Sequence, residues 1–176
     1  MSGHNKWSKI KNRKAVTDAR KSKIFTKMVR LLTVEAKKAK GNVDSPGLRT
    51  AIEKAKSVNV PNENIERAIK KATDASSGDM EAVTYEAYGP GGVAVMIEGL
   101  TDNRNKAAAE IKHILSKHGS ALAVIGSASW AFEKTREGWV PKIAQAISEE
   151  DFKKLEALVE ELEDNDEVQE VFTNAE

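Results

Sequence analysis

The sequence predicts an α+β protein in which an N-terminal three-helix bundle is followed by a ferredoxin-like α/β sandwich domain with an antiparallel sheet. Before residue 75, three separate segments have apolar residues at helical spacing, and near residue 83 the pattern changes to the alternation typical of a strand. After this opening strand, strands and helices follow in the ferredoxin-like order β-α-β-β-α-β. The chain accordingly divides into a flexible basic arm at 1–16, the bundle at 17–75 and the α+β domain at 80–176.

Three amphipathic helices with short loops build the predicted bundle. The first spans about 17–40 and stops at Gly41. The second has Ser45 as its N-cap and Pro46 in its first turn, and the third opens at Pro61. The inward-facing positions are Phe25, Met28, Val29, Leu32, Ala36, Ala39, Leu48, Ala51, Ile52, Ala55, Ile65, Ala68, Ile69 and Ala72. Such stripes are buried only against one another, which predicts a bundle.

Strands and two helices are predicted for the second domain. One helix follows Asp102 as its cap, and the other is capped by Ser148, with Asp151 completing a capping box. The segment Gly89–Gly92 (GPGG) is interpreted as a hairpin turn, with a phosphate-cradling loop as the alternative, although it lacks the Gly-Lys-Ser/Thr ending of a nucleotide P-loop. The expected strands are 83–88, 93–100, 129–133, 139–143 and 168–173.

Basic residues concentrate at the N-terminal end. The first 40 residues contain 13 Lys or Arg against 2 acidic residues, a net charge of +11. Residues 1–72 carry 19 basic and 6 acidic residues, whereas residues 73–176 carry 9 and 21, so +13 and −12 combine to +1. Burying an unpaired ammonium costs more than the stability of a domain, so the basic tract must face water or a polyanion. The asymmetry indicates one anion-binding end and one acidic end.

We predict that the basic side chains bind nucleic acid together with Trp7, the aromatic residue in the densest part of the basic tract. Lys and Arg attract phosphate, and the indole of Trp7 is suited to stacking on a base, with anchoring on the bundle as the alternative. For the whole tract, the alternative is a solvated basic tail. The predicted contact residues are Lys6, Trp7, Lys9, Lys11, Arg13, Lys14, Arg20, Lys21, Lys23, Lys27, Arg30 and Arg104.

Other classes of protein are disfavoured by the composition. The sequence contains no cysteine, which excludes disulfides, thiolate metal ligands and Cys nucleophiles. It has no apolar run of membrane-spanning length and no apolar core of a secretory signal at its start. We therefore expect a cytoplasmic, monomeric protein without a membrane contact or a cofactor.

No nucleophile, base and orienting residue stand together in the sequence, so we do not expect an enzyme. A nucleic-acid-modifying enzyme would need Asp102, Arg104 and His113 to surround a pocket, and a protein-only adaptor using the acidic half is a third class. His113 and His118 lie about 140° apart on a helix, so they do not converge on a metal. We expect the following acidic run to be a solvated helix end rather than a Mg²⁺ site: Glu161, Glu163, Asp164, Asp166 and Glu167.

Four strings cover most of the chain: GHNKWSKIKNRKAVTDARKSKIFTK, NVPNENIERAIKKAT, YEAYGPGGVAVMIEGLTDNRNKAAAEIKHILSKHG and LVEELEDNDEVQEVFTNAE. In this order they resemble the YebC/PmpR family, which includes the mitochondrial translational activator of cytochrome c oxidase. The resemblance implies control of gene expression through nucleic acid. It implies either DNA binding and transcription regulation, or ribosome association and promotion of translation, including through proline-rich stretches. The sequence shows no clear helix-turn-helix reader, which favours RNA without excluding DNA.

The sequence departs from the family pattern in two places. Members of the family carry a further α/β domain between the segments that match SWAFEK and WVPK, and here only Thr135 to Gly138 stand between them. We therefore expect that inserted domain to be absent. Residues 120–124 (SALAV) also replace a loop that is rich in Gly and Asn in the family.

Overall fold

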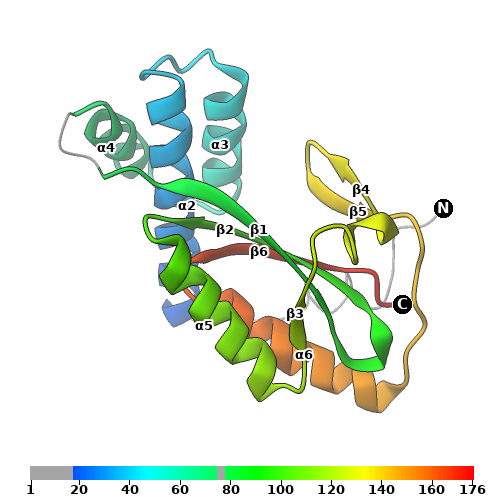
Figure 1. Ribbon diagram of the computed structural model, residues 1–176. Helices are drawn as coiled ribbons and strands as arrows, with labels where there is room; N and C mark the ends of the chain where they lie inside the picture. Colours follow the sequence, from blue (N-terminus) through cyan, green and yellow to red (C-terminus); the bar gives the residue numbers. More distant parts are fainter. Residues whose placement is uncertain (1–17, 75–77) are drawn as a thin grey trace. The chain divides into compact units, whose positions relative to one another are not determined.

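The computed structural model describes residues 18–74 and 78–176 (Figure 1). These residues form two compact units, one within residues 16–81 and the other spanning Ala82–Glu176. Helices make up the first unit, and an antiparallel sheet with two helices makes up most of the second. The predicted α+β fold class is therefore confirmed. The predicted flexible arm at 1–16 lies outside the described residues.

The first unit contains helices α2 (Asp18–Lys38), α3 (Pro46–Ser57) and α4 (Asn62–Thr73). Helix α2 packs against both of the others. The predicted apolar stripes meet, and their buried members are Leu32, Ala36, Leu48, Ala51, Ala55, Ile65, Ala68 and Ala72. Val60, from the loop before α4, joins this core. Alanine predominates in this core, so the helices approach closely.

The ends of the helices follow their local sequence. Gly41 adopts a φ of +79° and donates its N–H to the carbonyl of Ala36 at 2.9 Å, which ends α2 as predicted. Ser45 is the N-cap of α3, but its side chain makes no capping hydrogen bond. Helix α6 (Glu149–Asp164) begins at the predicted N-cap, because the Ser148 hydroxyl accepts the N–H of Asp151 at 3.1 Å. The Asp151 carboxylate accepts the Ser148 hydroxyl at 3.1 Å, whereas the predicted capping box uses the backbone N–H of Ser148.

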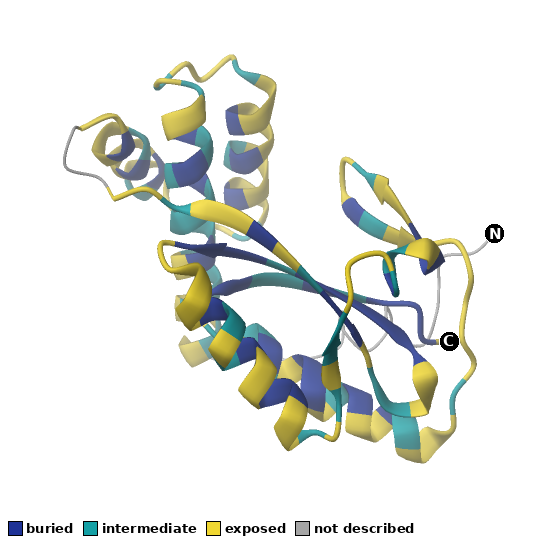
Figure 2. Ribbon diagram, viewed as in Figure 1, coloured by how far each residue is buried: buried dark blue, intermediate teal, exposed yellow. Residues whose placement is uncertain are grey.

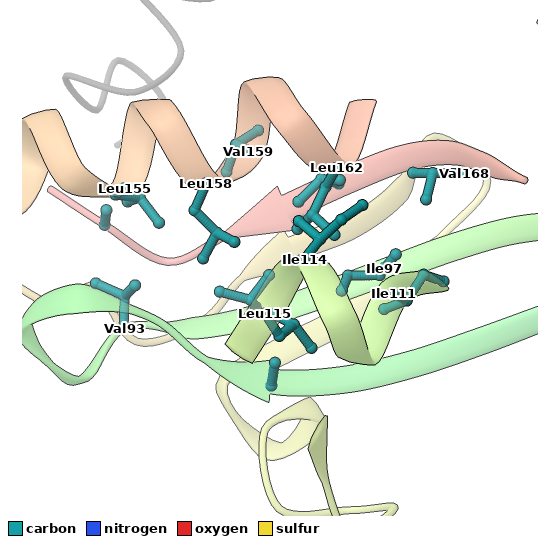
Figure 3. Packing of buried hydrophobic residues seen from close by; sticks show 14 residues of the cluster. Val93, Ile97, Ile111, Ile114, Leu115, Leu155, Leu158, Val159, Leu162 and Val168 are labelled. Carbon is teal, nitrogen blue, oxygen red and sulfur yellow. The ribbon is translucent and has the colours of Figure 1, made fainter. Parts of the chain in front are cut away.

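The second unit is built on a four-stranded sheet with the order β3-β1-β2-β6. Its strands are β1 (Glu81–Tyr88), β2 (Ala94–Thr101), β3 (Ala121–Ala123) and β6 (Val168–Thr173). The β3–β1 and β2–β6 pairs are antiparallel. Helices α5 (Arg104–Lys117) and α6 cover one face, where residues such as Ile111, Leu115, Leu158 and Leu162 form the main core with Ile97 (Figure 3).

The other face of the sheet is covered by a separate two-stranded ribbon of β4 (Phe132–Thr135) and β5 (Gly138–Pro141). A second cluster of Ala94, Met96, Ala128, Ala131 and Phe132 lies there. Alternate residues of β2 therefore point into two different cores, and Figure 2 shows this strand buried along nearly its whole length. A strand covered on both faces reads as a continuous apolar run, as AVMI does here.

The strands of the sheet differ in one respect from those expected. The predicted strands at 129–133 and 139–143 pair with each other in the ribbon, and the edge position of the sheet belongs to β3, which was not among the expected strands. Residues Ser129–Ala131 form a 3₁₀ turn instead of a strand. The reason is that Ala128 and Ala131, three residues apart, both pack into the second cluster, a spacing that suits a 3₁₀ turn.

The predicted cap of α5 is also wrong by one residue. Asn103, not Asp102, has the extended backbone of an N-cap, and its side-chain oxygen accepts the N–H of Lys106 at 3.0 Å. The Thr101 hydroxyl accepts the N–H of Asn103 at 2.9 Å, which fixes Asn103 in this position. Either residue type is a good N-cap, so the sequence alone did not distinguish them.

Candidate nucleic-acid interface

Helix α2 carries a continuous basic face. Lys23, Arg30 and Lys37 follow one another at seven-residue intervals, so they lie on the same side of the helix. Thr26 and Thr33 lie between them, and each hydroxyl donates to the carbonyl four residues earlier, at 3.0 and 2.8 Å. The threonine hydroxyls are thus engaged within the helix, and the charged groups of this face belong to the basic side chains.

Lys27 is the predicted contact residue that the structure places differently. Only 9% of its surface is exposed. It lies with Ile24, Leu31 and Val34 on a second apolar side of α2, which the sequence pattern did not separate from the basic face. The expectation that Lys27 is part of an exposed basic face is therefore wrong. Lys21, by contrast, is exposed, and together with Phe25 it lines a shallow hollow on α2.

The ends of α2 and α4 bring further lysines together. Gly41 lies against Thr73, and a hollow at this end of the bundle is lined by Lys37 and Lys40 with Asp74. The last turn of α4 adds Lys70 and Lys71. Sequence reasoning missed this basic end because it depends on two helices, far apart in the chain, terminating side by side.

The lysines at this end are partly compensated by carboxylates. Lys37 forms an ion pair with Asp79, and this hydrogen-bonded partner holds the pKa of Asp79 below its ordinary value. Lys38 pairs with Glu35 at 3.0 Å, and Arg49 at the start of α3 with Asp44 at 3.5 Å. Counting all charged residues, including these pairs, residues 18–81 contain 14 Lys or Arg and 9 Asp or Glu, a net charge of +5.

The remaining predicted contact residues belong to other parts of the chain or to another side of α2. Arg104 belongs to the other unit, where it is exposed in the first turn of α5. Arg20 is half-buried on α2, on the same side as Lys27. Six predicted residues lie outside the described part of the chain: Lys6, Trp7, Lys9, Lys11, Arg13 and Lys14.

The sheet unit has the opposite charge. Residues 82–176 contain 18 Asp or Glu and 9 Lys or Arg, a net charge of −9. The predicted solvated end of α6 is in part wrong, because Glu161 accepts hydrogen bonds from His118 at 2.6 Å and Lys117 at 2.9 Å, which lower its pKa. Glu167 is buried and pairs with Lys106 at 3.3 Å.

Other candidate sites show structural roles. The GPGG segment is a tight turn, in which Gly89 donates its N–H to the carbonyl of Val93 at 2.9 Å. A Cβ on Gly91, whose φ is +73°, would lie 2.5 Å from Ile147, so glycine is required there. Among residues 18–74 and 78–176, no three His, Asp or Glu side chains are placed to hold a metal. No helix in this part of the chain combines the length and apolarity that a membrane span needs.

Comparison with known families matches nearly the whole chain. Residues 5–75 match the TACO1/YebC protein N-terminal domain, and residues 80–137 and 133–175 match the TACO1/YebC second and third domain. The chain belongs to the TACO1/YebC family. The second TACO1/YebC match falls into two segments that overlap at residues 133–137, in β4 and the turn to β5, where the sequence predicts a missing insertion.

Curated relatives in the TACO1/YebC family are named "probable transcriptional regulatory protein". The one from Petrotoga mobilis is 47% identical over 98% of this chain, which spans 70% of that protein. The one from Thermotoga maritima is 54% identical over 76% of this chain, which spans 54% of that protein. A crystal structure of a conserved hypothetical protein from Aquifex aeolicus has a TM-score of 0.79 and 32% identity, covering 90% of this chain and 91% of that one.

Proposed function

We propose that this chain is a non-enzymatic, nucleic-acid-binding regulator of gene expression. Its basic N-terminal segment and the basic face of α2 hold phosphates, and its acidic sheet unit contacts proteins. The observation that carries this proposal is the segregation of charge, with 13 of the 28 Lys and Arg residues lying in the first 40 positions. A dense basic segment gives strong, sequence-independent attraction to a phosphate backbone.

The printed names of the relatives support a regulatory role. The Petrotoga mobilis and Pseudothermotoga lettingae proteins are each called a probable transcriptional regulatory protein, and they are 47% and 48% identical to this chain. By extension, transcription regulation through DNA binding is the first candidate function for this chain, with the cytoplasm as its compartment.

Ribosome association and promotion of translation form the second candidate. It is favoured by the surface of α4, whose exposed start carries Glu63 and Glu66. Glu63 pairs with Arg67 at 2.8 Å. Carboxylates at this position oppose the entry of α4 into a DNA groove as a recognition helix, because they would approach phosphates. Binding through shape and phosphates, as is typical for structured RNA, needs no such helix.

Co-sedimentation with ribosomes in the presence of excess duplex DNA separates the two candidates. The arm variant changes Lys9, Lys11, Arg13 and Lys14 to Gln. Its matched control changes four exposed basic residues of α3 and α4 to Gln and so removes the same charge: Arg49, Lys54, Lys56 and Arg67. Sedimentation that survives DNA, is lost in the arm variant and is retained in the control supports a translational role through the arm.

Other outcomes point elsewhere. Sedimentation that DNA abolishes would support the transcriptional candidate, and duplex binding would then be tested with the same two variants. Equal binding by the arm variant and wild type to both ribosomes and duplex DNA would contradict the proposed use of the arm. Turnover of DNA or RNA by a clean preparation, abolished by Asp102→Ala, would instead favour an enzyme.

A further inference from the structure

The loop between β3 and β4 presents large apolar side chains to solvent. Val124 is 81% and Ile125 is 91% exposed, and the nearby Trp130 and Tyr88 are 53% and 38% exposed. We call these four residues the loop patch. Residues 119–132 contain no Asp, Glu, Lys or Arg, although 31% of the whole chain is charged. A cluster of exposed apolar side chains is unfavourable in water and is typical of a surface that a partner covers.

A buried carboxylate holds the loop in place. Glu86 is 5% exposed and accepts the backbone N–H groups of Gly126 at 2.6 Å, Ala128 at 3.0 Å and Ser129 at 2.6 Å. Burial alone would raise the pKa of Glu86, but the three N–H donors hold it below its ordinary value. The side chain is therefore ionised at neutral pH, and charge-assisted hydrogen bonds of this kind are stronger than neutral ones.

The polar atoms of the aromatic residues are engaged inside the loop. The Ser127 carbonyl accepts the indole N–H of Trp130 at 2.7 Å and also the hydroxyl of Tyr88. The N–H of Ser127 donates to the carbonyl of Val124 at 3.0 Å, which closes the tip. The loop patch can therefore contact a partner mainly through its aromatic ring surfaces and aliphatic groups. Because the loop is already fixed, little conformational entropy would be lost on binding.

The surrounding charge favours a protein partner over a polyanion. The sheet unit carries a net charge of −9, which repels nucleic acid, anionic lipid headgroups and a second copy of the same unit. The centres of protein–protein interfaces are depleted of charge and enriched in aromatic residues, as the loop patch is. We propose that the loop patch docks a partner protein through an uncharged apolar groove that receives Val124 and Ile125.

Site-specific cross-linking in the intact chain tests this proposal. Photoreactive benzoylphenylalanine replaces Ile125 in one version and His113, exposed on α5 of the same unit, in the other. After irradiation in the native cell, we expect a nuclease-resistant protein adduct from position 125 that is absent from position 113. The captured protein is then purified, and its affinity for the wild-type chain is measured by calorimetry.

Affinity is compared between two double variants of equal charge. Val124→Asp with Ile125→Asp alters the loop patch, and Ala109→Asp with Ser116→Asp alters the exposed side of α5. We expect the first pair to weaken binding about tenfold or more and the second to leave it unchanged. Val124→Ser with Ile125→Ser replaces the first pair if it does not fold.

Several results would overturn the docking surface: adducts with nucleic acid, with lipid or with a second copy of the chain alone, no adduct specific to position 125, or equal affinity of both variants. Duplex and ribosome binding by the loop-patch variant should match wild type. Duplex and ribosome binding thus tests the proposed function, whereas cross-linking and calorimetry test the docking surface, so the two proposals can fail separately.

Discussion

A single side chain, that of Glu86, ties the backbone of a surface loop to β1. Sequence alone did not single it out, because an alternating strand predicts only that its neighbours Tyr85 and Ala87 face the opposite side of the sheet. What gives Glu86 its role is the return of residues 126–129, some 40 positions later, with three N–H groups pointing at one carboxylate. Such a partnership depends on tertiary structure and leaves no periodic signal.

Removing this carboxylate should destabilise the protein. Glu86→Ala leaves three buried or half-buried N–H groups without an acceptor, so we expect the free energy of unfolding to fall by about 2–4 kcal/mol. Urea denaturation of the purified protein measures the loss. Glu133→Ala, at an exposed position of β4, is the matched control and should change stability by less than about 0.5 kcal/mol. Equal values for the two variants would show that the loop is not held in this way.

The contribution of Glu86 should depend on pH. Because the folded pKa is depressed, the stabilisation is complete above the unfolded value of about 4.3 and is lost as the pH falls through the folded value. The difference in unfolding free energy between wild type and Glu86→Gln should therefore be constant between about pH 6 and 8 and shrink below about pH 4. Denaturation at a series of pH values measures it, and a difference that grows on acidification would reverse the assigned sign.

At the scale of elements, helices were predicted better than strand partners. The apolar stripes of α2, α3 and α4 recur within each helix, so local periodicity was enough to identify the core of the bundle. Strand pairing is not local. Residues 121–123 are too short to show alternation, and the ribbon of β4 and β5 has the same pattern whether it pairs with itself or joins the sheet. The burial of Lys27 was not predicted for a similar reason. The helical pattern identified one apolar side of α2 but not the second one, on which Lys27 lies.

Two serine caps provide a test at this scale. Ser148 accepts the N–H of Asp151 at the start of α6, whereas the side chain of Ser45 makes no capping bond to α3. We expect Ser148→Ala to lower the unfolding free energy by about 1 kcal/mol and Ser45→Ala to lower it by only a few tenths. Thermal or urea unfolding of the two variants compares them directly. A larger loss at Ser45 would contradict the assignment of the functional cap.

At the scale of the whole molecule, the dominant feature is the separation of charge between two units. Residues 1–81 carry +10 and residues 82–176 carry −9, so the total of +1 conceals two regions of opposite charge. This organisation was evident from sequence, since net charge needs no knowledge of the fold. The basic end formed by α2 and α4 was not, because it requires the packing of the helices.

The salt dependence of duplex binding should report the basic arm. Log affinity falls with log salt concentration by about 0.9 for each phosphate neutralised on duplex DNA. We expect the arm variant, with four charges removed, to reduce this slope by about 3–4, and the α3/α4 control to leave it almost unchanged. Fluorescence anisotropy from about 50 to 200 mM salt measures both. A shallow slope for wild type would contradict electrostatic binding altogether.

The turn between β4 and β5 has a consequence for how the architecture of this family can change. Thr135 and Gly138 are directly paired across the ribbon, so the chain leaves and returns at adjacent points. A folded domain inserted between Thr135 and Gly138 would require no rearrangement of β4 or β5. Removing such a domain would leave the two strands joined by a short hairpin turn. Loop-closure entropy grows only slowly with length, so gain or loss of such a module is thermodynamically inexpensive. The ribbon can thus serve as an evolutionary junction at which whole domains are exchanged while the sheet beneath it persists.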